Sequence, residues 1–245
     1  VVVIGALVVR TPGWPTVQET FFSGEQFADS FPALLEAFWL NVRIFLVAEP
    51  LILVVGILVA LARTLRSPVF LPLRVVATIY VDVFRGVPTI LVIFLLGFGV
   101  PALNLQGVPI DPVLWGTVAL ILSYGAYVAE VFRAGIMSVH PSQRMAARSL
   151  GLSVAQTNRY VVLPQAVRNV VPPLLNDFIS LQKDTALVNV IGAIDAFNQA
   201  KIVASNHFNL SSVTTVAFLF VLITIPQARW VDRLLEREQR RTRAG

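Results

Sequence analysis

Five long apolar stretches constrain this chain more than any other feature of its sequence. They are Ala33–Ala62, Val69–Leu103, Val113–Val131, Val167–Ile191 and Val213–Arg229. A helix needs about 17 to 25 mostly apolar residues to cross a bilayer. The chain is 56% hydrophobic and only 13% charged, whereas soluble domains carry about 25% charged residues. The sequence therefore predicts an all-α, polytopic membrane helical bundle with five core transmembrane helices.

A further apolar run, VVVIGALVV, opens the chain. We expect this run to be the end of another transmembrane helix that is cut short at Val1, which would bring the spans to six. A signal-peptide remnant is the alternative, but the run lacks a charged start and a small-residue cleavage site. Because no polar linker or repeat divides the sequence, residues 1–245 are expected to form a single transmembrane domain with its core spans in residues 33–229.

Arginines gather at the ends of alternate apolar stretches, and this placement predicts the orientation of the chain. Cytoplasmic loops of membrane proteins carry an excess of lysine and arginine. The arginine-rich segments are residues 63–74, residues 133–168 and the tail from Arg229. In contrast, residues 103–112 contain no cation, and residues 192–212 contain only Lys201. We therefore expect both the segment 139–165 and the C-terminal tail 230–245 to be cytoplasmic.

The net charge of +5 does not indicate nucleic-acid binding. Nucleic-acid recognition requires a solvated basic patch, whereas the arginines here flank apolar stretches. Basic segments beside a membrane are attracted to anionic lipid headgroups. Membrane lipid, and not nucleic acid, is therefore the partner that the charge pattern predicts.

Residues 139–165, which we call the elbow, interrupt the apolar pattern between the third and fourth stretches. The sequence Pro141-Ser142 predicts the start of a helix with Ser142 as its N-cap. Gly151 fits the left-handed position just past a helix end. Small or apolar residues then share one side of this helix, and they are Ala146, Ala147, Leu150 and Gly151. Two interpretations stay open: a helix lying on anionic lipid, and a surface that another protein approaches closely.

A second short helix is expected in the same segment. Ser153 and Gln156 have the spacing of a capping box, which marks a helix start. Leu163 precedes Pro164, and a residue before proline avoids the helical region. The elbow is therefore predicted to contain two short helices joined by a tight turn, with the second ending at Leu163.

Charged residues inside the apolar stretches are the next candidates for function. A charge at the bilayer centre costs about 2.5–3.5 kcal/mol, so such residues usually face a protein interior or a transport pathway. Asp82 and Arg85, and likewise Glu130 and Arg133, are three residues apart and are expected to pair. The fourth stretch is the most polar of the five, and we expect it to line a translocation route. The predicted pathway residues are Arg43, Arg85, Asn176, Asp177, Gln182, Lys183 and Asp184.

Groups suited to catalysis or metal binding are few. The chain has no cysteine, so thiol chemistry is excluded. Its two histidines, His140 and His207, fall in segments expected on opposite sides of the membrane. No G-x-x-x-x-G-K-[ST] sequence is present to cradle ATP phosphates. We therefore expect no catalytic residue, no metal site and no cofactor in this chain, and we do not expect it to be an enzyme by itself.

Two classes of function remain open from these residues alone. One is a membrane subunit that a separate protein drives. The other is a self-sufficient channel or ion-coupled carrier, in which Asp82, Asp177 and Asp184 would be ion or proton sites. An enzyme embedded in the membrane is disfavoured because no nucleophile–base pair is visible.

Four segments between Leu34 and Arg229 resemble the ABC import permeases for polar amino acids, the histidine and glutamine permease type. The elbow resembles the EAA loop of that family through Ala146, Ala147, Gly151, Val161, Leu163 and Pro164. The other segments are VDVFRGVPTILVIFLLGFGVP, AYVAEVFRAGIMSV and LPQAVRNVVPPLLNDFISLQKDTALVNVIG. The chain departs from the family pattern at four positions, where Ala134, Ser142, Met145 and Ala186 stand in place of glycine, glycine, glutamate and serine.

The resemblance implies a permease that crosses the inner membrane of a bacterium several times and is driven by a separate ATPase subunit. That partner would use the ATP and Mg, and the elbow would provide the coupling helix that docks on it. The implied coupling residues are Gln143, Met145, Ala146, Ala147, Leu150, Gly151, Leu163 and Pro164. A second permease copy or a related permease, an external solute-binding protein and a polar amino-acid substrate complete the implied assembly.

Overall fold

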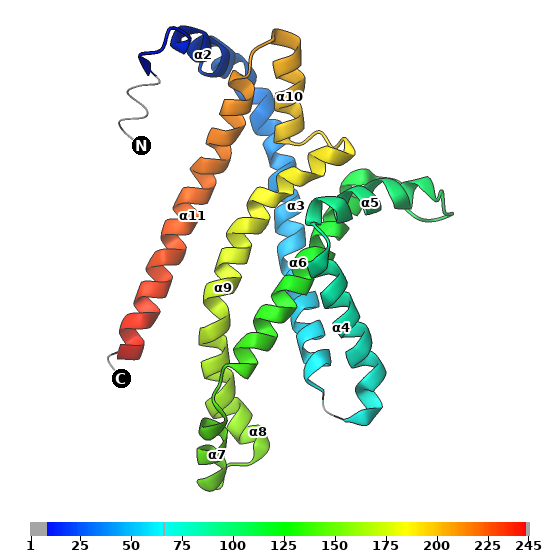
Figure 1. Ribbon diagram of the computed structural model, residues 1–245, viewed down its shortest axis with the longest axis vertical. Helices are drawn as coiled ribbons and strands as arrows, with labels where there is room; N and C mark the ends of the chain where they lie inside the picture. Colours follow the sequence, from blue (N-terminus) through cyan, green and yellow to red (C-terminus); the bar gives the residue numbers. More distant parts are fainter. Residues whose placement is uncertain (1–8, 66, 244–245) are drawn as a thin grey trace.

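In the computed structural model the described residues are 9–65 and 67–243, with side chains described as far as Glu236. Every element in this part of the chain is helical, so the predicted all-α fold is confirmed (Figure 1). The elements are α2 (Trp14–Phe21), α3 (Gly24–Thr64), η1 (Pro68–Phe70), α4 (Leu71–Gly86), α5 (Thr89–Ala102), α6 (Pro112–Met137), α7 (Pro141–Ser149), α8 (Val154–Thr157), η2 (Asn158–Val162), α9 (Leu163–Asp184), η3 (Thr185–Ile191), α10 (Ala196–His207) and α11 (Ser211–Arg243). The expected helix at the start of the chain falls mostly on residues 1–8, outside this description.

Helix length and composition mark the membrane-crossing parts of the described chain. Three helices are long and apolar enough to cross by themselves, in residues Trp14–Thr64, Pro112–Met137 and Ser211–Glu236. Two further pairs qualify together but are bent, and counting each pair as one span gives up to five. The five predicted stretches coincide with these five segments, because an apolar run of spanning length has to be helical in lipid.

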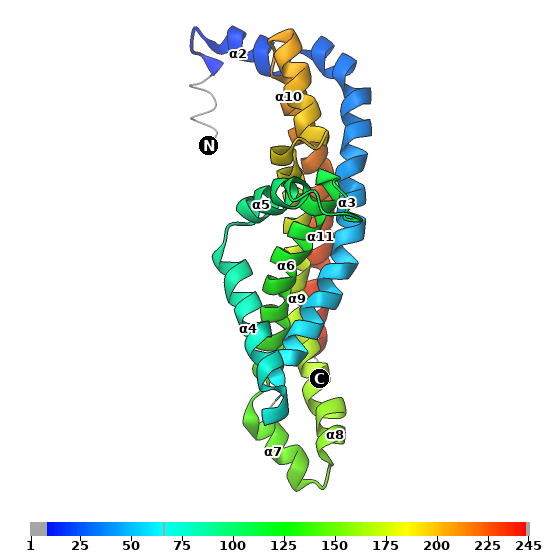
Figure 2. The same cartoon turned by 90° about the vertical axis from the view of Figure 1, so that its right-hand side faces the viewer.

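The second predicted stretch is not one straight helix. It is broken between α4 and α5, which meet at 104° across Val87 and Pro88 (Figures 1 and 2). Val87 has an extended backbone, with ψ at 131°. A residue before proline is pushed out of the helical region, and Pro88 then caps the start of α5. The prediction of a continuous helix was wrong here because apolar content does not report this bend.

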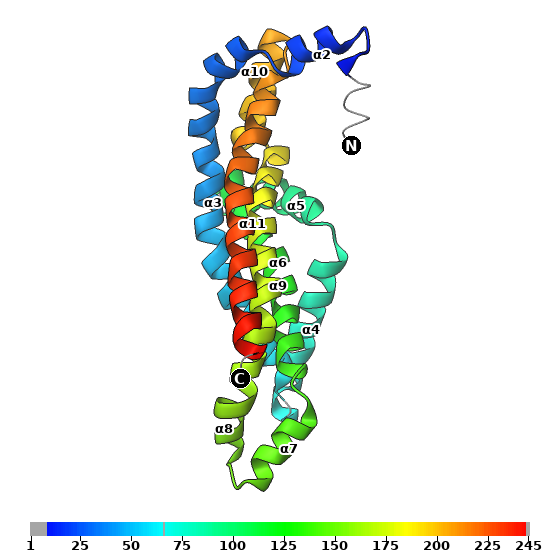
Figure 3. The same ribbon diagram turned by 90° about the vertical axis from the view of Figure 1, so that its left-hand side faces the viewer.

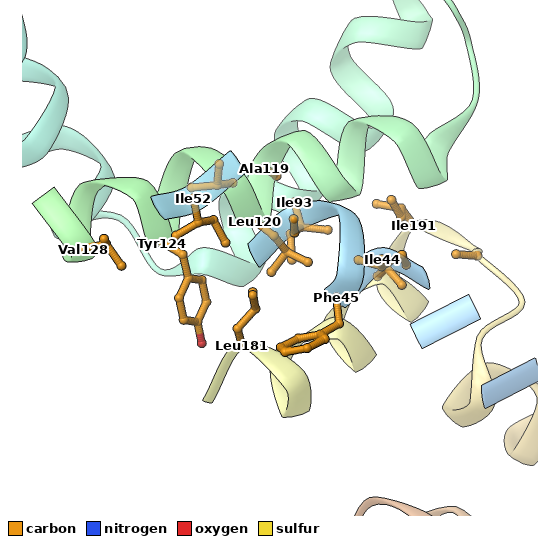
Figure 4. Packing of buried hydrophobic residues seen from close by; sticks show 14 residues of the cluster. Ile44, Phe45, Ile52, Ile93, Ala119, Leu120, Tyr124, Val128, Leu181 and Ile191 are labelled. Atoms are coloured by element: carbon orange, nitrogen blue, oxygen red, sulfur yellow. The ribbon is translucent and has the colours of Figure 1, made fainter. Parts of the chain in front are cut away.

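The core of the molecule lies where α3, α5 and α6 meet the end of α9. Five elements, α3, α5, α6, α9 and η3, contribute apolar side chains that interdigitate (Figure 4). The labelled members are Ile44, Phe45, Ile52, Ile93, Ala119, Leu120, Tyr124, Val128, Leu181 and Ile191. A glycine allows α3 to approach α6 closely, since a Cβ on Gly56 would lie 2.4 Å from Cγ1 of Val128. This packing fixes α9 against α6 and therefore positions its polar residues.

A buried polar network ties α10 to α3. The side chain of Asn41 donates to Asp195 Oδ2 at 3.0 Å and accepts from the backbone N–H of Ala196 at 3.1 Å. Asp195 is fully buried and also caps α10 by accepting from the N–H of Asn198. Because buried polar groups need partners, the network holds the chain at the bend that follows η3.

Different elements lie at the two ends of the molecule. The elbow projects from one end, which we call the elbow end, and α2 and α10 lie at the opposite end (Figures 1 and 3). The C-terminal end of α11 lies in the half of the molecule nearer the elbow. The elbow and the C-terminal part of α11 are therefore near the same end, as their shared arginine content predicted.

Candidate functional site

The first helix of the elbow, α7, begins two residues earlier in the chain than the sequence predicted. His140 is its N-cap, because the imidazole Nδ1 accepts from the N–H of Ser142 at 3.2 Å. Ser142 was predicted as the N-cap and is instead inside the first turn. Proline favours the first helical position, so Pro141 moves the cap to the residue before it.

A Schellman motif closes α7 and reverses the chain at the tip of the elbow. Leu152 N–H donates to the Ala147 carbonyl at 3.2 Å, and Gly151 N–H donates to the Arg148 carbonyl at 3.0 Å. Gly151 has φ at +85°, a conformation that costs a residue with a Cβ about 1–2 kcal/mol. The predicted left-handed glycine is therefore confirmed, and it makes the turn tight.

The second helix of the elbow starts as predicted but does not end as predicted. Ser153 Oγ accepts from Gln156 N–H, and Gln156 Oε1 accepts from Ser153 N–H at 2.8 Å, which completes the capping box. The helix then passes through a π-helical turn, η2, into α9 without leaving helical geometry at Leu163. Pro164 lies in the first turn of α9, where its missing N–H is tolerated. The predicted end at Leu163 was therefore wrong.

Most of the predicted coupling residues lie on the outside of the elbow. Met145 is 62% exposed and Leu150 is 84% exposed at the tip. The other exposed members are Gln143, Ala146, Gly151, Leu163 and Pro164. Ala147 differs, because it is 3% exposed and packs inside its own chain. Large apolar side chains this exposed indicate a surface that another protein or the membrane covers.

Three charges link α3 and α6 at the elbow end. Arg63 Nη1 donates to Glu130 Oε2 at 2.7 Å, and Arg133 also pairs with the Glu130 carboxylate. The predicted Glu130–Arg133 pair is confirmed, whereas the partner from α3 was missed because it is distant in sequence. The predicted Asp82–Arg85 pair is not among the ion pairs of the described residues. Arg85 instead lies over the ring of Tyr127, 5.7 Å from its centroid.

The polar residues of α9 divide between two faces. Asn176 and Lys183 are seven residues apart and exposed on one face. Asp177 and Asp184 have the same spacing and are partly buried on the neighbouring face. Seven residues are close to two helical turns, so each pair lines up along the helix. The polar residues of α9 therefore form two adjacent strips, and a translocation route along them stays a prediction.

The inner strip of α9 faces two groups, Tyr124 and Glu49, that the sequence did not predict as its neighbours. Tyr124 on α6 donates its hydroxyl to Asp184 Oδ2 at 2.7 Å. Glu49 on α3 is close enough to Asp177 to interact with it electrostatically. Asp177 Oδ2 and Gln182 Oε1 are buried without a hydrogen-bond partner among the described residues. Buried acceptors usually have a donor, and none of the described residues supplies one to these two oxygens.

The remaining predicted pathway residues lie apart from this strip. Arg43 on α3 and Arg85 on α4 are both exposed. No hydrogen bond or ion pair among the described residues joins either arginine to Asp177. No group of three or more histidine or acidic side chains within the described residues is arranged to hold a metal ion.

Helices of membrane-spanning length, an exposed helical elbow and a polar strip within the bundle together define a membrane transport protein of the permease class. Residues 52–243 match the family described as the binding-protein-dependent transport system inner membrane component. The chain belongs to this family.

Relatives in three bacteria agree with this assignment. The chain is 35% identical over 210 residues to a probable glutamine ABC transporter permease protein of Bacillus subtilis strain 168, covering 85% of this chain and 94% of the relative. It is 33% identical over 188 residues to the glutamine transport system permease protein of Escherichia coli K12, covering 77% and 84%. The glutamate transport system permease protein of Corynebacterium glutamicum is 34% identical over 221 residues, covering 86% and 96%.

Solved structures share the fold. A crystal structure of an amino acid ABC transporter with histidines superposes with a TM-score of 0.77 at 31% identity, covering 86% of this chain and 96% of that one. An inward-facing structure of a methionine ABC transporter gives a TM-score of 0.62 at 18% identity, covering 83% and 94%, and supports the fold alone.

These comparisons confirm the predicted permease function and the resemblance on which it was based. The chain is the membrane subunit of an ABC transporter, and membership of this family implies an ATPase partner and a permease partner. The family description also places it in an inner membrane.

Proposed function

We propose that this permease imports a polar amino acid by alternating access, driven by ATP and Mg on a separate ATPase subunit. The elbow is proposed to be cytoplasmic and to transmit the motion of that ATPase to α9. An external solute-binding protein would deliver the substrate, and a second permease, identical or related, would complete the pathway. The observation that carries this proposal is the exposed elbow with its helical connection to the polar strip of α9.

The elbow has the properties of a docking helix. Met145 and Leu150 present apolar side chains that the chain itself does not cover. The family residue in place of Met145 is a glutamate, so the contact here would be apolar where relatives use a carboxylate. Burial of an exposed leucine or methionine contributes about 1.5–3 kcal/mol. Two such side chains at the tip therefore support docking without the glutamate.

The two strips of α9 support an amino acid as the substrate. A free amino acid carries an ammonium and a carboxylate, and both need partners away from water. Asp177 and Asp184 would attract the ammonium group, and Lys183 on the adjacent strip would attract the carboxylate. The relatives named for glutamine and glutamate support the same substrate class. Glu49 would add negative charge on the ammonium side.

Substitutions at Gly151 test this proposal, because they can alter the turn of the elbow while the membrane helices still fold. Gly151→Val places a β-branched side chain at φ +85°, and this conformation is strained for any residue with a Cβ. The matched control is Gly151→Asn, because asparagine tolerates the left-handed region. We expect the valine variant to insert and bind lipid normally but to lose most ATP-driven uptake in vesicles, whereas the asparagine variant keeps it.

The readouts are uptake of labelled glutamine, glutamate and histidine and the ATP hydrolysis that each one stimulates in the reconstituted complex. Normal coupled uptake by Gly151→Val would show that the elbow does not transmit the motion. Uphill uptake by this chain alone, driven by an ion gradient and without the ATPase, would contradict the proposal and favour an ion-coupled carrier.

A further inference from the structure

A large cavity lies between the elbow and the neighbouring ends of α3, α4 and α6. Its volume is about 1050 Å³. Six of its lining residues are arginines: Arg63, Arg74, Arg133, Arg144, Arg148 and Arg159. They come from four separate parts of the chain, so the fold, and not a local charge run, brings them together. None of the described residues that line the cavity is acidic.

Most of this positive charge is not compensated by the chain. Arg63 and Arg133 share the single carboxylate of Glu130. The other four arginines have no carboxylate partner among the described ion pairs. A backbone carbonyl satisfies one N–H of an arginine but carries no charge to neutralise it.

The contacts of these four arginines leave donors available. Arg74 donates to the Leu65 carbonyl at 3.1 Å and Arg144 donates to the Ile136 carbonyl at 3.0 Å. Arg159 lies over the ring of Tyr160. Each guanidinium has five N–H donors, so these contacts use a minority of them. The Nε of Arg144 is buried without an acceptor in the described chain, and this donor needs one.

The rest of the cavity wall is largely apolar. It includes Leu61, Leu65, Ile136, Val162 and Leu163. A ligand that satisfies the whole wall must therefore carry an anionic group beside an apolar part. Guanidinium groups bind phosphate oxygens with two parallel hydrogen bonds, and several arginines around one cavity match the several oxygens of a phosphate.

We propose that this cavity is a binding site for a phosphate-bearing anion. The two sources of such a group are the headgroup of an anionic phospholipid and a soluble polyphosphate. The cavity lies at the ends of the membrane helices, where headgroups are located, and its apolar wall fits the first part of an acyl chain. An anionic phospholipid is therefore expected to bind more tightly than a soluble phosphate. The site is separate from the polar strip of α9 and from the exposed tip of the elbow.

Calorimetric titration of the full chain in neutral detergent tests this site. The probes are dioctanoyl phosphatidylglycerol, dioctanoyl phosphatidylcholine and sodium pyrophosphate. We expect saturable binding of the phosphatidylglycerol and little binding of the zwitterionic lipid. Binding of pyrophosphate alone would still support a phosphate site but would assign it to a soluble ligand. Absence of binding by both anions would overturn the proposal.

Variants show whether the arginines of the cavity are responsible. Arg74→Gln removes a charge contributed by α4 and Arg159→Gln removes one contributed by the elbow, and each should weaken binding about tenfold because a charge-assisted contact with the phosphate is lost. Arg74→Lys and Arg159→Lys keep the charge and should retain part of the binding. The matched control is Arg168→Gln, an exposed arginine on α9 that does not line the cavity.

Folding of each variant is checked by its helical circular dichroism and its thermal unfolding midpoint. Arg159 is exposed, so its glutamine variant remains informative if the change at Arg74 disturbs the fold. An equal loss of affinity in Arg168→Gln would mean that anion binding depends on the net charge of the protein and not on the arginines of the cavity. The assignment of the cavity would then be wrong.

Discussion

Among the described residues, Glu130 forms the ion pairs that join α3 to α6 at the elbow end. Its carboxylate accepts from Arg63 on α3 and Arg133 on α6, and all three side chains are between 14% and 29% exposed. Partial burial makes such contacts stronger than ion pairs in water. Loss of the carboxylate would leave two arginines close together with no opposing charge.

Glu130→Gln is therefore expected to lower the free energy of unfolding by about 1.5–3 kcal/mol for each charge-assisted hydrogen bond that is lost. The measurement is the thermal and denaturant unfolding of the purified chain in detergent. The control is Asp232→Asn, whose pair with Arg229 is 3.9 Å long and 59% exposed at the aspartate. An exposed pair contributes at most about 1 kcal/mol. Equal stability of Glu130→Gln and the native chain would refute the structural importance of this site.

Lys183 provides a second test on the scale of one residue. Lys183→Met removes the cation proposed to attract the substrate carboxylate, and uptake by the complete transporter should fall about tenfold or more, since an unpaired charge costs at least about 2 kcal/mol. Lys201→Met is the matched control, because Lys201 is the other lysine of the chain and lies on α10 with its ammonium group donating to Asn189. Unchanged uptake of all three labelled amino acids in Lys183→Met would remove it from the route.

For individual residues, the sequence predicted correctly those contacts whose partners are close together in the chain. The capping box of Ser153 and Gln156 and the left-handed Gly151 follow from spacing and backbone sterics alone. Tyr124 could not be predicted as a partner of Asp184, because sixty residues separate them and a tyrosine in an apolar run usually belongs to the core. Arg63 was missed as a partner of Glu130 for the same reason.

At the scale of elements, α6 and α9 are tightly packed where Gly135 of α6 faces Val170 of α9. A Cβ on Gly135 would lie 2.1 Å from Cγ2 of Val170, which is itself buried. A real Cβ cannot occupy that position unless the Val170 side chain or α9 shifts. The polar strips depend on this packing, since α6 also carries the tyrosine that binds Asp184.

Gly135→Ala should therefore destabilise the chain by about 1–3 kcal/mol, the usual cost of overpacking. Gly99→Ala is the control, because a Cβ on Gly99 meets nothing within 4 Å and alanine favours a helix more than glycine does by about 1 kcal/mol. Thermal unfolding in detergent compares the two. A Gly135→Ala midpoint as high as that of Gly99→Ala would show that α9 can shift at no cost.

The positions of the elements were predictable, but their bends were not. Apolar length alone located all five stretches, because spanning helices need about 20 such residues. Proline had opposite effects at two places: Pro88 accompanies a 104° break, whereas Pro164 lies inside continuous helical structure. The difference is a π-helical turn before Pro164, and turns of this kind have no reliable sequence signal.

For the whole molecule, the surface indicates a subunit that is covered on several sides. Large exposed apolar side chains extend along α3, α4 and α5, including Trp39, Val76 and Leu95. Such extensive apolar exposure belongs to lipid or protein contacts. The orientation of the chain in that environment stays a prediction from the arginine distribution.

The absence of cysteine makes this orientation directly measurable. Single cysteines at exposed positions, Gln106→Cys, Leu150→Cys and Ser205→Cys, are treated with a membrane-impermeant maleimide, and the native chain is the unlabelled control. We expect labelling of positions 106 and 205 only from outside the cell, and of position 150 only in inside-out vesicles. Labelling of positions 106 and 150 from the same side would show that α6, which lies between them, does not cross the membrane.

The uninterrupted helical path from Val154 to Asp184 has a mechanical consequence. At 1.5 Å per residue this path is about 46 Å long, so under the proposed coupling it would act as a lever arm between the tip and the bundle interior. A tilt of about 10° at one end displaces the other by about 8 Å, roughly twice the separation of two carbon atoms in contact. Pro172 and Pro173 lie partway along it and set where the arm can flex. Small rotations outside the bilayer can therefore open or close a passage the width of a side chain.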